Sequence, residues 1–353
     1  MRVLIVKMSA LGDIIHALPV LDYLHRVSPG IEIDWVVEEQ FNEILAGNPL
    51  IARLHVVRTK VWRRQPLARQ TRREIGDLKA ALRERSYDLV FDIQGNLKSG
   101  LVDWLSGAEQ VIGFDAEVLQ EKANLFFTTR QVPIRRTDHH VTDQYLRLVS
   151  VPFGKDFAGM ELATDIVTSP DDDSAADALL ATLDDGLVFL FHYGTTWQTK
   201  FWTENGWIEL GRAVLERFPA SSILFSWGNE EERQVVMRLV AAIGNGARVI
   251  DRYPLKGLIA LLKKVDLVVG GDTGPTHLAA AVGTPTVSFY RASDGRRSGP
   301  RGNGHGIVQA PLHCTKCFRT KCDDDQKCRE SIRSAALLKE IERLLSAVPA
   351  PLA

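Results

Sequence analysis

The chain has 353 residues, a formal net charge of −1 and 45% apolar side chains. The length suits two domains, and the composition is typical of a globular protein with a sizeable core. Because the net charge is close to zero, no global field favours a nucleic-acid partner, and any basic recognition has to be local. No apolar run reaches the length of a membrane-spanning helix and no signal-peptide pattern opens the chain, which predicts a cytoplasmic protein.

The chain begins with a β-turn-α-β pattern. We predict an apolar strand at residues 2–7, a helix at 14–27 capped by Asp13, and a second strand at 31–37. This order implies a parallel sheet with right-handed crossovers, on which ligands gather at the carboxyl ends of the strands. Asp13 follows the first strand at that edge, so it is either a helix cap or a general base.

Residues 58–85 are rich in arginine and lysine, contain few acids and carry Trp62 among the charges. The ordinary interpretation of such a run is a solvated helix face. The alternative is a patch for phosphates or for an anionic membrane surface. Further along, His139 and His140 precede a predicted helix at 141–148, and a metal site is not favoured because no third ligand follows at a recognisable spacing.

Residues 151–185 are predicted to link two domains, 1–165 and 166–353, because they carry prolines, glycines and acidic runs. The β/α alternation restarts at 187–191, and the cleft between two such domains is the usual place for a ligand. Glu230 follows a later predicted strand. It could accept hydrogen bonds from both hydroxyls of a ribose, or it could be an acid favoured by a helix dipole.

The stretch 266–285 is predicted to form a strand, a glycine turn and a small-residue helix at 276–282. The turn lets backbone N–H groups at the helix start face a ligand, and the helix dipole favours an anion there. Thr273 and Thr276 add hydroxyl donors. We predict a diphosphate cradle at this turn, with an ordinary strand–helix connection capped by Asp272 as the alternative.

The chain has only four cysteines, and all of them fall near its C-terminal end. Disulfides are the weaker interpretation in a reducing compartment. Their spacing loosely fits a tetrahedral zinc site of thiolates, which we keep as a hypothesis behind free thiols. These residues are Cys314, Cys317, Cys322 and Cys328.

Four motifs carry a family resemblance. They are KMSALGDIIHALP at 7–19, HYGTTWQTKFW at 192–202, WGNEEER at 227–233 and GGDTGPTHLAAAVGTP at 270–285. In this order, from residue 1 to about residue 333, the chain resembles the bacterial lipopolysaccharide heptosyltransferases of glycosyltransferase family 9. Three segments resemble the members that transfer heptose from ADP-L-glycero-D-manno-heptose to the Kdo of Kdo-lipid A. They are WVVEE, residues 87–95 and the basic segment with Trp62. The cysteine-bearing tail is more similar to the second heptosyltransferase, so a heptosylated core acceptor is the alternative.

The resemblance implies an α/β protein of the GT-B type, in which two Rossmann-like domains face each other across a cleft. It implies an acceptor-binding domain at 1–165, a nucleotide-sugar-binding domain at 166–353, and peripheral attachment to the inner face of the cytoplasmic membrane. We expect an inverting reaction without cofactor or metal. Lys200 and the helix start would supply positive potential, and no Asp-x-Asp pair lies at the linker-side strand ends.

The resemblance also assigns roles to residues. It implies that Asp13 is the general base and that Lys200 stabilises the leaving diphosphate. The implied donor-binding residues are Thr195, Thr196, Lys200, Glu230, Asp272, Thr273, Gly274 and His277. The implied acceptor-binding residues are Arg63, Arg64 and His140.

Two other classes of function share the fold. A nucleotide-sugar epimerase needs no large second substrate, so the basic segment would have no role in it. A non-catalytic binding protein would keep the diphosphate cradle but would need no base at Asp13.

Overall fold

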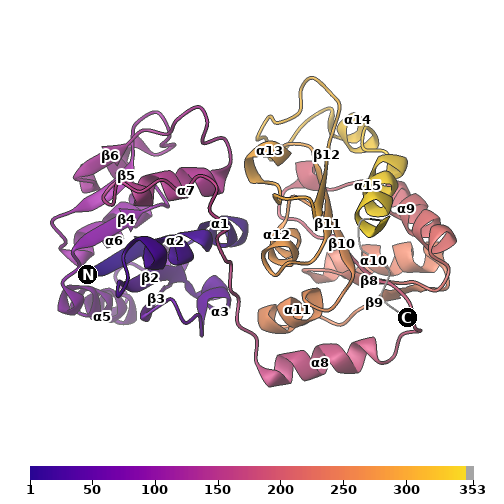
Figure 1. Ribbon diagram of the computed structural model, residues 1–353, viewed down its shortest axis with the longest axis horizontal. Helices are drawn as coiled ribbons and strands as arrows, with labels where there is room; N and C mark the ends of the chain where they lie inside the picture. The colour runs from indigo at the N-terminus through magenta and orange to yellow at the C-terminus, as the bar shows by residue number, and fades with distance from the viewer. Residues whose placement is uncertain (347–353) are drawn as a thin grey trace. The chain divides into compact units, whose positions relative to one another are not determined.

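The computed structural model describes residues 1–346 and divides the chain into two compact units. The first is Met1–Val167 and the second starts at Thr168; the sequence analysis placed this boundary at 165. Each unit is built on a six-stranded sheet whose neighbouring strands are all parallel (Figure 1). The predicted α/β class with two parallel sheets is therefore confirmed. Among residues 1–346, no helix combines the length and the apolar character needed to cross a membrane.

The N-terminal sheet has the strand order β3-β2-β1-β4-β5-β6. Its strands are β1 Arg2–Val6, β2 Glu32–Glu38, β3 Arg53–Val57, β4 Leu89–Asp92, β5 Val111–Phe114 and β6 Arg130–Val132. Val6 of β1 lies opposite Asp92 of β4, so the turns that follow these two strands leave the same edge of the sheet side by side. The central strands are continuously apolar, as expected for strands covered by helices on both faces.

Most helices of this unit lie in the connections between its parallel strands. The helices are α1 Leu11–Ala17, α2 Pro19–Val27, α3 Asn42–Leu45, α4 Thr59–Arg64, α5 Arg69–Arg85, α6 Leu97–Ser106 and α7 Val141–Ser150, with 3-10 turns η1 Glu39–Phe41 and η2 Lys122–Phe127.

The predicted single helix at 14–27 is wrong in two respects. The helical run begins at Leu11, and it is divided before Pro19 into α1 and α2. Proline has no N–H to continue the helical hydrogen bonds, and its ring clashes with the carbonyl one turn back. Asp13 is therefore the third residue of α1 and not its cap.

The C-terminal sheet has the strand order β12-β11-β10-β7-β8-β9. Its strands are β7 Val188–His192, β8 Ser222–Ser226, β9 Ala247–Val249, β10 Leu267–Gly271, β11 Thr286–Tyr290 and β12 His305–Gln309. His192 of β7 lies opposite Gly270 of β10, so the segments after β7 and β10 emerge next to each other.

Helices flank this second sheet as well. They are α8 Pro170–Leu180, α9 Glu204–Arg217, α10 Glu230–Ile243, α11 Leu255–Leu262, α12 Gly274–Ala281, α13 Gly295–Ser298, α14 Asp325–Glu330 and α15 Ser334–Ser346, with the 3-10 turn η3 Gln198–Lys200. The predicted linker at 151–185 is only partly a linker, because α8 begins within it and packs on α11. Ser169 caps α8 by accepting a hydrogen bond from the N–H of Asp172. The helix was not predicted because its sequence is polar and acidic.

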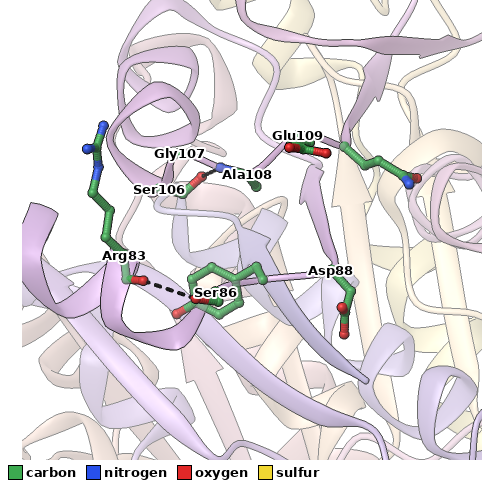
Figure 2. A pocket seen from close by; sticks show the side chains of 9 residues that line it. Arg83, Ser86, Asp88, Ser106, Gly107, Ala108 and Glu109 are labelled. Carbon is green, nitrogen blue, oxygen red and sulfur yellow. Dashed lines mark hydrogen bonds between the residues drawn. The ribbon is translucent and has the colours of Figure 1, made fainter.

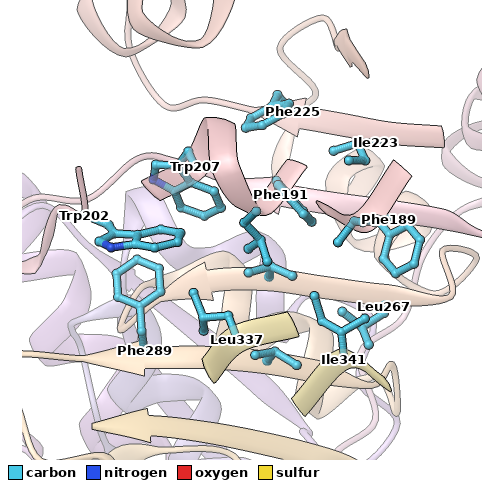
Figure 3. Close-up of a cluster of buried hydrophobic side chains, with 14 of the residues drawn as sticks. Phe189, Phe191, Trp202, Trp207, Ile223, Phe225, Leu267, Phe289, Leu337 and Ile341 are labelled. Carbon is cyan, nitrogen blue, oxygen red and sulfur yellow. The ribbon is translucent and has the colours of Figure 1, made fainter. Parts of the chain in front are cut away.

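The core of the C-terminal unit is strongly aromatic (Figure 3). The Trp202 and Trp207 rings lie 5.3 Å apart, and α15 adds Leu337 and Ile341 to the same cluster. The indole N–H of Trp202 donates to the carbonyl of Ile332 at 3.1 Å. Trp202 thereby anchors the end of the segment that follows β7.

Candidate functional site

The turn after β10 holds three interacting polar side chains. The carboxylate of Asp272 lies 2.6 Å from Nζ of Lys200 and accepts a hydrogen bond at 2.9 Å from Nε2 of His277. All three side chains are largely buried, with exposed fractions of 17% for Lys200, 10% for Asp272 and 5% for His277. Burial by itself would raise the pKa of Asp272, but the hydrogen bond from His277 and the charge of Lys200 hold it well below its usual range.

Lys200 reaches Asp272 because β7 and β10 are neighbours. It ends the 3-10 turn η3, and its Nζ lies 4.7 Å from the centre of the Trp197 ring. Two residues later the buried Trp202 fixes the chain. The lysine is therefore held from both sides at the carboxyl edge of the sheet, where ligands of parallel sheets bind.

Helix α12 starts two residues earlier than predicted. Its cap is Thr273, so the alternative in which Asp272 caps the helix is wrong. The hydroxyls of Thr273 and Thr276 lie 3.3 Å apart. A side chain at Gly270 would place its Cβ 2.3 Å from the Thr276 hydroxyl, so glycine allows the helix start to approach β10 closely. The N-terminus of α12 and Lys200 together make a site suited to an anion.

The segment after β7 carries the two predicted phosphate-binding threonines. Thr195 is half-buried and Thr196 is exposed, between His192 and η3. His192, the last residue of β7, is buried, with its Nδ1 2.9 Å from the Ser226 hydroxyl. Burial lowers the pKa of His192 to about 4, so this imidazole is neutral at pH 7.

Two glutamates stand at the carboxyl end of β8. Glu230 opens α10 with an exposed carboxylate 3.2 Å from Arg233. Glu232 is 7% exposed and accepts a 2.7 Å hydrogen bond from the N–H of Gly228. A Cβ at Gly194 would lie 2.2 Å from Oε2 of Glu232, so the glycine makes room for this carboxylate between the ends of β7 and β8. The sequence analysis missed Glu232, because only the start of the helix fixes which of three successive glutamates turns inward.

In the N-terminal unit, Asp13 lies in the first turn of α1. Its Oδ2 accepts a hydrogen bond from the N–H of Ala10 at 3.2 Å, which stabilises the helix start. Its Oδ1 lies 3.5 Å from the hydroxyl of Tyr145, at the outer limit for a hydrogen bond. Lys7, at the end of β1, places Nζ 4.9 Å from the centre of the Tyr145 ring. Asp13 is thus partly buried beside a tyrosine whose ring contacts a lysine, at the edge where a base is expected.

Gln94 is a second residue that the sequence analysis missed. Its Oε1 accepts hydrogen bonds from the N–H groups of Met8 and Ser9, at 3.1 and 3.0 Å. The buried Asp92 in turn accepts from the N–H groups of Gln94 and Gly95. The turn after β4 therefore holds the turn that leads into Asp13. The sequence feature that could have indicated this role is a glutamine followed by a glycine directly after a predicted strand.

The predicted acceptor residues lie on two different helices. His140 caps α7, because its Nδ1 accepts from the N–H of Thr142 at 3.2 Å, and its ring lies edge-on 5.3 Å from that of His16. Arg63 and Arg64 are exposed on α4. The structure thus gives His140 a buried capping position and leaves the two arginines accessible.

Helix α4 is held by two acidic side chains. Glu38, at the end of β2, accepts a hydrogen bond from the N–H of Thr59 at 3.2 Å. Glu74 of α5 accepts from the indole N–H of Trp62 at 2.7 Å and also pairs with Arg58. These contacts fix the helix that carries the accessible arginines.

The four cysteines form no disulfide with one another and are not gathered into a metal site. Cys314 and Cys317 are exposed, and Cys322 and Cys328 are partly buried. Within residues 1–346, no group of three or more His, Cys, Asp or Glu side chains is placed to hold a metal ion. The zinc hypothesis receives no support from this arrangement.

One pocket lies away from these residues, at the amino ends of β4 and β5. It has a volume of about 510 Å³ and is lined by Arg83, Tyr87, Ser106 and Glu109 among others (Figure 2). Because ligands of parallel sheets bind at the opposite edge, we do not take this pocket as the functional site.

A family model described as glycosyltransferase family 9 (heptosyltransferase) matches residues 75–327. The chain belongs to this family. A Pseudomonas aeruginosa protein named lipopolysaccharide heptosyltransferase 1 is 36% identical over 91% of this chain and 87% of its own length. This family 9 member is therefore an enzyme of the heptosyltransferase type, as the four motifs indicated.

Two solved structures resemble this family 9 enzyme over nearly its whole length. E. coli heptosyltransferase WaaC with ADP has a TM-score of 0.79 and 27% identity, covering 98% of this chain and 100% of that chain. E. coli WaaC with ADP-2-deoxy-2-fluoro heptose has a TM-score of 0.76 and 27% identity, covering 97% of this chain and 99% of that chain. The predicted GT-B type is confirmed by these neighbours.

Proposed function

We propose that this enzyme transfers L-glycero-D-manno-heptose from ADP-heptose to the Kdo of Kdo-lipid A, with inversion at the transferred sugar carbon. The relative named lipopolysaccharide heptosyltransferase 1 supports a lipopolysaccharide acceptor, and the neighbours with ADP and an ADP-heptose analogue support the donor. In this proposal the N-terminal unit binds the acceptor and the C-terminal unit binds the nucleotide sugar.

The observation that carries the proposal is the cluster of Lys200, Asp272 and His277 at the start of α12. When the bond between the sugar and the diphosphate breaks, negative charge grows on the leaving oxygen. Lys200 and the N–H groups at the start of α12 stabilise that charge. Because this cation and helix dipole already supply positive potential, the proposed transfer needs no metal ion.

Asp13 is the proposed general base. It removes the proton from the acceptor hydroxyl while that oxygen forms the new bond to the sugar carbon, and the ADP oxygen leaves from the opposite face. Tyr145 and the hydrogen bond from Ala10 orient the carboxylate. A nucleotide-binding protein without catalysis would not need a carboxylate held in this way.

The remaining proposed donor contacts divide between phosphates and nucleoside. Thr195 and Thr196 follow β7 next to Lys200 and suit the diphosphate, as do Thr273 and Gly274 at the start of α12. For the ribose we propose Glu232 in addition to the predicted Glu230. The carboxylate of Glu232 lies at the sheet edge, whereas the carboxylate of Glu230 is exposed and paired with Arg233.

The proposed acceptor contacts are Arg63 and Arg64 on α4, because guanidinium groups suit the carboxylates and phosphates of a Kdo-lipid A. His140 remains a proposed acceptor residue, although its buried capping position leaves little of its ring accessible. A lipid-linked acceptor also implies peripheral association with a membrane. A heptosylated core acceptor, as used by a second heptosyltransferase, is the alternative that the cysteine-bearing tail suggests.

The test is incubation with ADP-heptose and either Kdo-lipid A or its monoheptosylated form, followed by mass spectrometry of the products. We expect one added heptose on Kdo-lipid A, ADP release that depends on the acceptor, and unchanged activity with a chelator. A product only from the monoheptosylated acceptor would support the alternative. A change in the sugar without any acceptor would indicate an epimerase and contradict the proposal.

A further inference from the structure

Helix α6 of the N-terminal unit carries apolar side chains on both of its faces. Val102 and Leu105 turn inward and pack on the sheet with residues of α5. Leu97, Leu101 and Trp104 turn outward with exposed fractions of 44%, 48% and 61%. Because these positions are spaced by four and three residues, they share one face of the helix.

A fourth exposed apolar side chain belongs to the turn that packs on α6. Phe126, in the 3-10 turn η2, is 90% exposed. The turn packs on α6, and a side chain at Gly100 would place its Cβ 2.4 Å from the Phe127 ring, so the glycine lets the turn lie against the helix. We call Leu97, Leu101, Trp104 and Phe126 the α6 patch. Clustered exposure of this kind marks an interaction surface more often than scattered single residues do.

Lysines border the α6 patch. The Nζ of Lys79, on the adjacent helix α5, lies 6.0 Å from the centre of the Trp104 ring. Lys98 is exposed on α6 between two patch residues, and Lys122 is exposed at the start of η2. The neighbouring acid Glu121 is occupied at the helix start, where it accepts a 2.8 Å hydrogen bond from the N–H of Leu97. Helices α5 and α6 pack on each other, which places Lys79 beside the α6 patch.

We propose that the α6 patch docks the N-terminal unit onto an anionic phospholipid bilayer. Tryptophan and phenylalanine enter the boundary between headgroups and acyl chains, leucines add apolar area, and the bordering lysines attract anionic headgroups. The charge of the border selects this occupant. An apolar centre with a border of lysines matches a bilayer that has an apolar interior and anionic headgroups. The inference rests on and deepens the proposed function, because it names the surface by which the enzyme meets a lipid-linked acceptor.

The experiment is co-sedimentation of the full chain with vesicles of phosphatidylglycerol and phosphatidylethanolamine, with phosphatidylcholine vesicles as the comparison. We expect binding to the anionic vesicles that weakens with salt. The double substitution Trp104→Ser with Phe126→Ser should lower the partition coefficient by roughly tenfold or more. Lys98→Glu with Lys122→Glu should abolish the preference for anionic vesicles. Phe318→Ser is the matched control, because it removes an exposed aromatic ring, 51% accessible, from the other unit.

Heptose transfer to a delipidated, water-soluble acceptor is measured in parallel, and circular dichroism checks that each variant is folded. Lost vesicle binding with unchanged transfer supports the inference. It is overturned if the wild-type chain does not bind the anionic vesicles, or if the double variant binds them as well as wild type. It is also overturned if light scattering shows a dimer that the double substitution converts to a monomer while vesicle binding is unchanged. The patch would then be an interface between two copies of the chain. Vesicle binding through the patch without any heptose transfer would contradict the proposed function and leave the docking surface standing.

Discussion

Nζ of Lys200 lies 2.6 Å from Oδ2 of Asp272, and this ion pair joins the segment after β7 to the turn after β10. The carboxylate fixes the position of the lysine, while His277 holds the carboxylate from its other side. A diphosphate bound at the start of α12 would share the lysine with Asp272. The ion pair holds the lysine in a fixed position without any ligand, and in the proposed mechanism this preorganised cation would stabilise the developing charge.

We expect Lys200→Ala to slow the chemical step by roughly 10²-fold or more, equivalent to about 3 kcal/mol. It should weaken ADP binding by a smaller factor, because the charge on the leaving oxygen grows only during bond breaking. Lys200→Arg should rescue poorly, since a planar guanidinium does not reproduce a compact ammonium. Single-turnover rates and ADP affinities check this. An equal effect on both quantities would mean that Lys200 only holds the donor.

The same ion pair predicts coupling between its two members. Asp272→Asn removes the charge but keeps the shape, and it should slow the reaction less when Lys200 is already alanine than when it is present. The measurement is a double-mutant cycle on the single-turnover rate. Strictly additive effects would show that the carboxylate does not act through the lysine.

Asp13 can be tested as a base separately from its contact with Ala10. Asp13→Asn retains an oxygen that can accept from the N–H of Ala10, but an amide cannot remove a proton. We expect a loss of about 10²–10⁴-fold in turnover for both Asp13→Asn and Asp13→Ala, with donor affinity retained. Turnover near wild type for Asp13→Asn at saturating acceptor would reduce Asp13 to a helix-stabilising residue.

Gln94 is expected to act as a positioning residue. Gln94→Leu leaves the N–H groups of Met8 and Ser9 without their acceptor, and the turn before Asp13 should shift. We expect kcat to fall by about tenfold, with little change in ADP affinity. Gln94→Glu keeps an accepting oxygen and should retain more activity than Gln94→Leu. Equal losses of kcat and of ADP affinity would instead indicate general destabilisation.

The arginines on α4 should act on the acceptor alone. Neutralising Arg63 and Arg64 to glutamine should raise the acceptor KM and flatten its dependence on salt, with little effect on ADP-heptose. The matched control neutralises Arg72 and Arg73, which are exposed on α5. If both pairs change the acceptor KM equally, the effect is a general field and not a contact made by α4.

His192 predicts how stability depends on pH. Its folded pKa of about 4 lies below its ordinary value of 6.5, so between these values only the unfolded chain takes up the proton. The contribution of this pKa difference to the free energy of unfolding is about 3 kcal/mol. It is fully present above pH 6.5 and is lost as the pH falls towards 4. Urea unfolding followed by tryptophan fluorescence should give a shallower pH dependence over this window for His192→Gln. An unchanged slope would show that another group titrates.

Local patterns predicted much of the fold and failed at identifiable points. The apolar runs predicted β1, β2, β7 and β10, because a strand buried on both faces is apolar over about five or six successive residues. They did not predict β3, β6, β11 or β12. The helix at 14–27 failed because Pro19 was overlooked as a break, and α8 was hidden in an acidic stretch whose cap, Ser169, is visible only once the helix exists. Gln94 was missed because its partners, Met8 and Ser9, follow a different strand. Glu232 was missed because only the start of α10 fixes which of three successive glutamates turns inward.

The sequence by itself determined the α/β class, the two-unit organisation and the family, because alternating elements and motif spacings are written along the chain. Only the tertiary structure decided that Lys200 pairs with Asp272, which lies 72 residues away in the chain. That contact depends on β7 and β10 being neighbours in the sheet. Strand order is set by how all the apolar faces of a unit are buried together, which no local stretch of sequence specifies.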